Sequence, residues 1–217
     1  MNEESIIEQT MQFVKTELEG AEAGHDWWHI ERVYKNALKI AASEPVNLFV
    51  VRLAALLHDI ADAKFHGGDE NAGPNKAGKF LRSAGVPPET TDHVENIIRH
   101  LSFKGGNVPV AFHSGELAVV QDADRLDALG AIGIARAFHY GGYRNRELYH
   151  PDRPPDMHLT KETYRSSTAP TLNHFYEKLL LLKDRMHTAT GRTLAENRHA
   201  FLERFLEEFL AEWQGER

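Results

Sequence analysis

Three short clusters of histidine and aspartate lie within or next to apolar stretches of this sequence. They are GHDWWH with His25 and His29, LLHDIAD with His58, Asp59 and Asp62, and QDADRLD with Asp122, Asp124 and Asp127. An ionised carboxylate in an apolar helix is costly unless it is paired or bound to a metal. His58 and Asp59 are adjacent at the end of a predicted helix, so both could reach one ion. His29 and Asp124 could complete its ligand shell.

Two imidazoles and two carboxylates would form a mixed nitrogen and oxygen ligand set. Such a set suits Mn²⁺, Fe²⁺, Co²⁺ or Zn²⁺, with Mg²⁺ less natural because of the imidazoles. We expect Mn²⁺, with Ni²⁺ as a further candidate. With four protein ligands, an octahedral ion keeps positions open for water and a substrate oxygen, so it could activate water. Asp62 lies one turn after His58 and could accept the proton of that water.

Each cluster also has a purely structural interpretation. His25 and His29 lie four residues apart and could cap and pack a helix. The acidic residues at 122, 124 and 127 could be a helix cap, an exposed carboxylate and an ion pair with Arg125. The HDWWH run also imitates a zinc-protease motif, but Asp replaces Glu and no third ligand follows at protease spacing. The joint occurrence of three clusters favours the metal site.

Hydrophobic periodicity of about 3.6 residues predicts helices along most of the chain. An apolar stripe from Trp27 to Ile40 predicts a helix that Pro45 stops, and a stripe from Leu48 to Leu57 predicts the next helix. The other expected helices cover residues 3–19, 71–84, 88–100, 115–138, 172–187 and 190–212. Since no long stretch alternates with period two, the sequence predicts an all-α fold. Two loops, 66–71 and 141–164, interrupt the helices. The second is long enough to be either a lid over a cleft or a solvated excursion without a role.

Composition narrows the classes of protein that this chain can belong to. It has 217 residues, no cysteine, 13 histidines and a formal net charge of −7. Without cysteine, any metal must be held by His, Asp and Glu. The acidic surplus argues against an extended nucleic-acid interface. The N-terminal residues lack a signal-peptide pattern and no apolar run is long enough to span a bilayer, so we expect a cytoplasmic protein that binds no membrane.

Five sequence blocks together resemble the HD-domain metal-dependent phosphohydrolase superfamily, and in particular its stand-alone bacterial YpgQ/YedJ-like branch. The blocks are GHDWWH, LAALLHDIADAKF, IIRHLSF, QDADRLDALGAIGIARAF and HFYEKLLLLKDRMHTATGR, which extend from Gly24 to Arg192. The resemblance implies one all-helical HD domain over residues 1–217 with a metal in its central cleft. Its motif core would cover residues 24–138, with C-terminal helices at 165–213 packed on that core.

The resemblance also implies roles for individual residues. The superfamily's metal ligands match His29, His58, Asp59 and Asp124. Asp124 is preferred to Asp122 because it precedes Arg125-Leu126, as the fourth ligand does in relatives. Asp62 matches the acidic residue near the attacking water, where many relatives have Glu, so a shorter side chain stands at this position.

Candidates for contacting the substrate are less specific. His100 could contact the substrate or a second metal, and His93, seven residues earlier, could join it or simply cap and line its helix. Lys64 and Arg125 are candidates for neutralising phosphate.

The reaction that the resemblance implies is hydrolysis of phosphoanhydride or phosphoester bonds in nucleotides. We expect a nucleoside or deoxynucleoside triphosphate to be cut to monophosphate plus diphosphate. The alternatives are a phosphodiesterase or nucleotide monophosphatase of the same superfamily, and a non-catalytic module that binds nucleotide. The sequence does not specify the oligomeric state, for which a homodimer is one option.

Overall fold

The computed structural model describes residues 2–21, 24, 26–61, 69, 71–101, 112–158, 163 and 167–217. No strand occurs in these ranges, and helices are their regular structure, which confirms the all-α prediction. The chain forms two compact units, Met1–Asp124 and Arg125–Arg217. The expectation of one domain over the whole chain stays a prediction. Within the ranges given above, no helix is long and apolar enough to cross a membrane.

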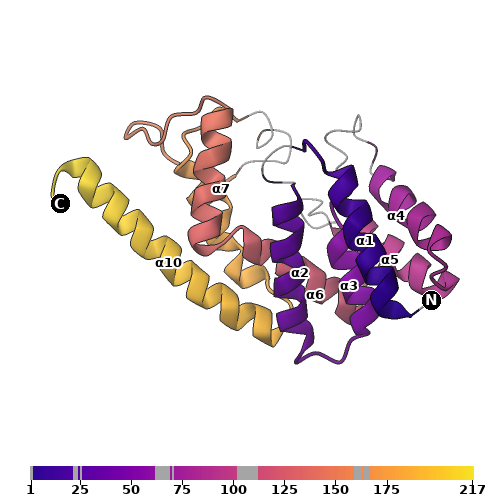
Figure 1. Cartoon of the computed structure of the whole chain (residues 1–217). Helices are drawn as coiled ribbons and strands as arrows, with labels where there is room; N and C mark the ends of the chain where they lie inside the picture. Colours follow the sequence, from indigo (N-terminus) through magenta and orange to yellow (C-terminus); the bar gives the residue numbers. More distant parts are fainter. Residues whose placement is uncertain are drawn as a thin grey trace. The chain divides into compact units, whose positions relative to one another are not determined.

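The first unit is built around one almost fully buried helix. Its helices are α1 (Glu3–Glu17), α2 (Trp27–Ala41), α3 (Leu48–Leu57), α4 (Ala72–Ser83), α5 (Pro88–Leu101) and most of α6 (Gly115–Asp127). All residues of α3 except Leu48 and Arg52 are buried. This helix packs against α1, α2 and α5, and α4 packs on α5 (Figure 1). The burial of α3 explains its continuous apolar sequence.

Side-chain caps fix where the helices of the first unit begin. Asp26 caps α2 by accepting a hydrogen bond from the backbone N–H of His29 at 3.0 Å. Asn47 caps α3 in the same way, through the N–H groups of Phe49 and Val50. Such caps stabilise a helix by about 1 kcal/mol. The cap of α2 therefore orders the helical turn that carries His29.

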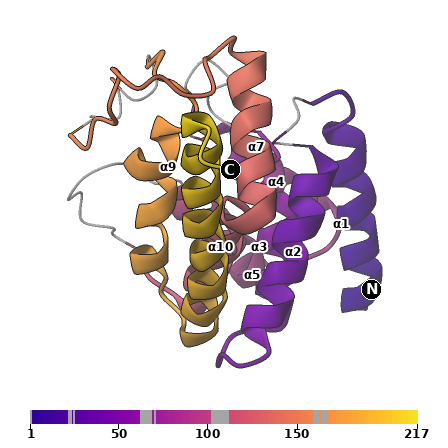
Figure 2. The same ribbon diagram turned by 90° about the vertical axis from the view of Figure 1, so that its left-hand side faces the viewer.

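The second unit has an aromatic core. Its helices are α7 (Gly130–Tyr143), α9 (Asn173–Glu177) and α10 (Ala189–Gln214), with the 3₁₀ turns η2 (Leu179–Leu181) and η3 (Lys183–Arg185) before α10. α10 packs along α7 (Figure 2). The ring of Phe138 on α7 lies 5.8 Å from Phe175, 5.9 Å from Phe205 and 6.1 Å from Phe209, measured between centroids. Contacts between these rings pack α7, α9 and α10 against one another.

The predicted helix over residues 115–138 is wrong, because two helices occupy this stretch. α6 ends at Asp127, Leu129 is extended, and α7 starts at Gly130, whose φ of 68° is left-handed. Glycine adopts this conformation without the steric penalty that a Cβ brings. Apolar residues continue on both sides of the break, so the periodicity alone does not reveal it.

The predicted helix over residues 172–187 is also wrong. It consists of the short α9 and the two 3₁₀ turns, and the backbone leaves helical geometry at Lys178, with φ −142° and ψ −55°. The buried Leu179 and Leu182 lie three residues apart. Both an α-helix and a 3₁₀-helix place residues with this spacing on one face, so the pattern does not distinguish them.

Part of the predicted long loop is fixed to the start of α9. α7 continues to Tyr143, so the loop begins later than expected. The backbone N–H groups of Thr171 and Leu172 donate to the carbonyls of Glu147 and Leu148 at 2.8 and 2.9 Å. A lid function for this loop stays a prediction. Of the other predicted loop, the structure describes residues 69 and 71.

Candidate metal centre

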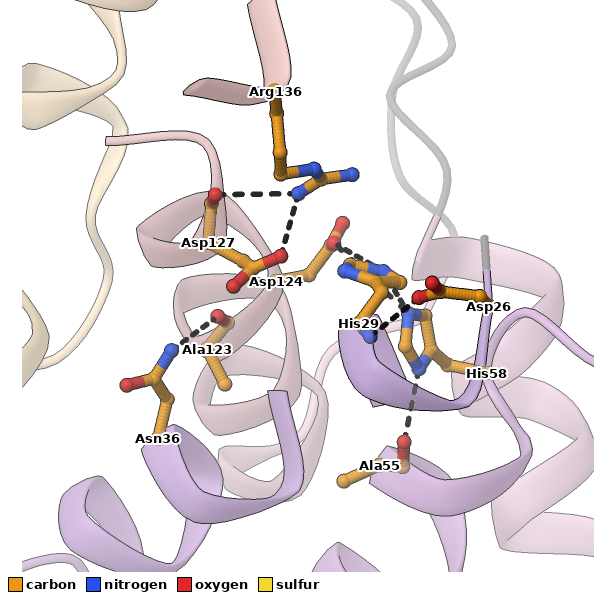
Figure 3. A network of polar contacts seen from close by, with 9 residues as sticks. All are labelled: Asp26, His29, Asn36, Ala55, His58, Ala123, Asp124, Asp127 and Arg136. Atoms are coloured by element: carbon orange, nitrogen blue, oxygen red, sulfur yellow. Dashed lines mark hydrogen bonds and ion pairs between the residues drawn. The ribbon is translucent and has the colours of Figure 1, made fainter. Parts of the chain in front are cut away.

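Two histidine rings from different helices meet in the first unit. His29 lies in the first turn of α2, and His58 follows the last residue of α3. Their Nε2 atoms are 3.3 Å apart, and their side chains are 2% and 3% exposed. Figure 3 shows the two rings pointing toward each other. Two titratable groups are thus brought together in a largely buried place.

A backbone carbonyl orients the ring of His58. Its Nδ1 atom lies 2.9 Å from the carbonyl oxygen of Ala55, the geometry of an N–H donating to an acceptor. With the proton on Nδ1, Nε2 carries a lone pair that faces His29. Metal-binding histidines are commonly held by such a hydrogen bond from the other ring nitrogen.

Carboxylates lie beside both histidines. A ligand atom of Asp59 lies within 4.8 Å of those of His29 and His58. Asp124, in the last turn of α6, places Oδ1 3.6 Å from Nε2 of His29 and 4.0 Å from Nε2 of His58. The side chain of Asp124 is 42% exposed, so this edge of the cluster is open to solvent. The structure thus brings His29 and His58 close to both predicted acidic ligands.

The geometry favours Asp124 over Asp122 as the carboxylate of α6. Residues two positions apart on an α-helix point about 200° away from each other. Because Asp124 faces the two histidines, Asp122 points in a different direction. Asp122 is completely buried.

The donor set fits a divalent transition-metal ion. The lone pair on Nε2 of His58 needs a proton or a cation to face it, and carboxylates that accompany two imidazoles supply negative charge. Such mixed sets bind Mn²⁺, Fe²⁺, Co²⁺ or Zn²⁺. Metal binding by His29, His58, Asp59 and Asp124 stays a prediction that this arrangement supports.

Two of the predicted substrate residues, His100 and Arg125, contact backbone carbonyl groups. Nδ1 of His100 lies 2.8 Å from the carbonyl oxygen of Asn96, and its ring centroid is 5.4 Å from that of Phe112. Arg125 donates to the backbone carbonyl of Arg185 at 2.7 Å, so part of its guanidinium has a structural partner. Asp62 and Lys64 lie outside the described residues, as does His25. Substrate contacts of His100 and Arg125 stay predictions.

His93 belongs to a network at the start of α6. Its Nε2 atom lies 3.1 Å from Oγ of Ser114 and 3.5 Å from Oε2 of Glu116. Burial opposes ionisation of Glu116, but hydrogen bonds from the backbone N–H groups of Asn47 and of Glu116 itself, with His93 nearby, leave its pKa below the usual value. This network gives His93 a structural role.

Comparisons with known proteins show similarity over nearly the whole chain. The model of the HD domain family matches residues 27–129. YpgQ of Bacillus subtilis (strain 168) is 39% identical over 207 residues, which cover 95% of this chain and 93% of YpgQ. A crystal structure of an HD-superfamily hydrolase from Bacillus thuringiensis matches with 44% identity and a TM-score of 0.79, covering 98% of this chain and 99% of that one. The crystal structure of Bacillus subtilis YpgQ in complex with ADP matches with 35% identity and a TM-score of 0.77, covering 98% and 96%.

Proposed function

Since the chain belongs to the HD domain family, we propose that it is a metal-dependent phosphohydrolase acting on nucleotides. The reaction proposed is cleavage of a nucleoside or deoxynucleoside triphosphate to a monophosphate and diphosphate. Mn²⁺ is the proposed metal. The observation that carries the proposal is the convergence of His29, His58, Asp59 and Asp124 at one place.

The proposed nucleotide substrate draws support from a relative. YpgQ, which matches this chain over nearly its full length, has been crystallised with ADP. ADP combines a base, a sugar and a phosphoanhydride, the chemical features that the proposed substrate shares.

The side chains of the site would divide the work of hydrolysis. When bound, a divalent ion would polarise a phosphoryl oxygen and lower the pKa of a water molecule. Asp62 would accept a proton from the attacking water as a general base. His100, Lys64 and Arg125 would hold the phosphate oxygens through charge and hydrogen bonds. Asp124 lies at the exposed edge of the cluster, where a substrate could approach.

Product analysis tests this function directly. The purified protein is incubated with Mn²⁺ and each common ribo- and deoxyribonucleoside triphosphate, and the phosphorus products are separated by ion chromatography. Diphosphate and nucleoside monophosphate in equal amounts are expected. Orthophosphate released from monophosphates would indicate a monophosphatase, and cleavage of a diester probe a phosphodiesterase. Tight nucleotide binding without any hydrolysis would indicate the non-catalytic module.

Alanine variants test whether the cluster of His29, His58, Asp59 and Asp124 binds the metal and is needed for hydrolysis. His58→Ala and Asp59→Ala should lose bound Mn²⁺ and hydrolysis together. His139→Ala, which removes an exposed imidazole from α7, should keep both. Retention of the wild-type metal stoichiometry by His58→Ala and Asp59→Ala would contradict the ligand assignment.

A further inference from the structure

The position of Asp124 depends on how the end of α6 is held. Asp124 lies three residues before Asp127, the last residue of this helix. The last carbonyl groups of an α-helix have no partner within the helix, and such ends fray unless other groups bind them. The other proposed ligands lie on α2 and just after α3. The centre therefore requires that the last turn of α6 be fixed relative to these elements.

Asn36 connects α2 directly to this part of α6. Its Nδ2 group donates to the carbonyl oxygen of Ala123, the residue before Asp124, at 3.3 Å. Asn36 follows His29 by seven residues, which places both on the same face of α2, two turns apart. α2 thus meets α6 twice, once through Asn36 and Ala123 and once through His29 and Asp124 (Figure 3). Two contacts between the same helices restrict both sliding and rotation.

An ion pair holds the final residue of α6. Arg136 on α7 donates through Nη1 to Oδ2 of Asp127 at 2.6 Å and to the backbone carbonyl of Asp127 at 3.2 Å (Figure 3). The side chain of Asp127 is 2% exposed, so this pair is largely shielded from water. Arg198 on α10 donates to the neighbouring carbonyl of Leu126. Arg136 and Arg198 thus bind the end of α6 within the second unit, whereas the contact of Asn36 with α6 lies within the first unit, which contains the proposed metal ligands.

We propose that Asn36 is a positioning residue that holds Asp124 at the metal centre. The inference deepens the proposed function, because it rests on Asp124 being a ligand of that centre. Asn36 does not need to touch the metal or the nucleotide. It would act through the backbone of α6, since small displacements of a supporting element weaken a metal site.

Metal affinity, measured apart from hydrolysis, tests the inference. The variant is Asn36→Leu, which removes the donor at similar volume. The Kd for Mn²⁺ is measured by electron paramagnetic resonance of the free ion, at a temperature where circular dichroism shows every variant to be folded. Asn36→Leu should raise the Kd about 10- to 100-fold, the usual effect of losing a group that supports a ligand.

Control variants separate positioning from general stability. Arg82→Gln removes an ion pair with Glu95 at 2.7 Å between α4 and α5, and Asn75→Leu replaces an exposed asparagine of α4. These helices carry none of the proposed metal ligands, so the Kd should not change. An unchanged Kd in Asn36→Leu would overturn the inference, as would an equal rise in the controls or an absence of Mn²⁺ binding by the wild-type protein. If the wild-type protein binds Mn²⁺ and the expected Kd pattern appears without nucleotide hydrolysis, the inference stands and the proposed function fails.

Discussion

At the scale of single residues, the carboxylate of α6 decides how the metal centre is completed. Asp124→Asn should weaken Mn²⁺ binding, because the variant removes a negative oxygen donor 3.6 Å from Nε2 of His29. Asp122→Asn should leave the metal affinity unchanged. Because Asp122 is completely buried, that substitution should instead lower the free energy of unfolding by about 1–3 kcal/mol. Isothermal titration with Mn²⁺ and urea unfolding of both variants measure the two effects. Weaker Mn²⁺ binding by Asp122→Asn, with unchanged binding by Asp124→Asn, would identify Asp122 as the ligand.

Asp62 is predicted to act on the proton rather than on the metal. Asp62→Asn should retain Mn²⁺ while turnover falls by about 10²–10⁴-fold, the usual contribution of a general base. Steady-state hydrolysis of a triphosphate and metal analysis after dialysis measure the two properties. Asp92→Asn alters an exposed aspartate of α5 and serves as the control, with wild-type turnover expected. Wild-type turnover in Asp62→Asn would remove this residue from the mechanism.

At the scale of elements, the left-handed Gly130 at the start of α7 keeps α6 and α7 from forming one continuous helix. Gly130→Ala should destabilise the protein by about 1–2 kcal/mol, because a Cβ is disfavoured at a φ of 68°. The added Cβ would also lie 3.2 Å from Cβ and Cγ of Arg198. Gly142→Ala in the last turn of α7 is the matched control, since its Cβ would meet no atom within 4 Å and alanine favours a helix. Urea unfolding compares the two, and equal stability would refute this explanation of the break.

The sequence predicts several helices closely. The apolar stripes from Trp27 to Ile40 and from Leu48 to Leu57 lie within α2 and α3, and the expected helix at 88–100 agrees with α5 to within one residue at each end. The predictions of a single helix over 115–138 and over 172–187 failed. A left-handed glycine and a change from α to 3₁₀ geometry interrupt these helices without interrupting the apolar pattern of the sequence. A single glycine in an apolar helix is ambiguous until its φ is known.

The candidate site, too, could be predicted from the sequence only in part. The proximity of His29, His58 and Asp59 follows from titratable residues placed at the ends of apolar helices, which the sequence displays. The carbonyl of Ala55 that orients His58, and that of Ala123 that Asn36 binds, are backbone groups. Every residue carries such a group, so no side-chain pattern marks the ones that support the site.

At the scale of the whole molecule, the two compact units differ in the residues that form their cores. The four proposed metal ligands all belong to Met1–Asp124, where α3 forms the apolar centre. Arg125–Arg217 has the cluster of phenylalanine rings instead, and it also contains His174 on α9. Protonation of His174 should therefore affect the folding of the second unit.

Acid should destabilise the protein partly through His174. Burial of the imidazole, together with the positive charges of Lys178 and Arg146, lowers the pKa of His174 to about 3 from the usual 6.5. Between these two pH values the unfolded chain binds a proton that the folded chain does not, so the free energy of unfolding falls as the pH falls. One such proton contributes a slope of up to about 1.4 kcal/mol per pH unit. Above pH 6.5 the imidazole is neutral in both states and the contribution to the slope disappears.

His174→Gln should remove this part of the pH dependence. Urea unfolding of the wild-type protein and the variant, followed by circular dichroism at pH 7.5, 6 and 5, gives the two slopes. The wild-type slope below pH 6.5 should exceed that of His174→Gln by close to one proton. Equal slopes in His174→Gln and the wild type would mean that His174 is protonated as readily in the folded protein as in the unfolded chain. The charges of Lys178 and Arg146 would then have to be neutralised by other groups near α9.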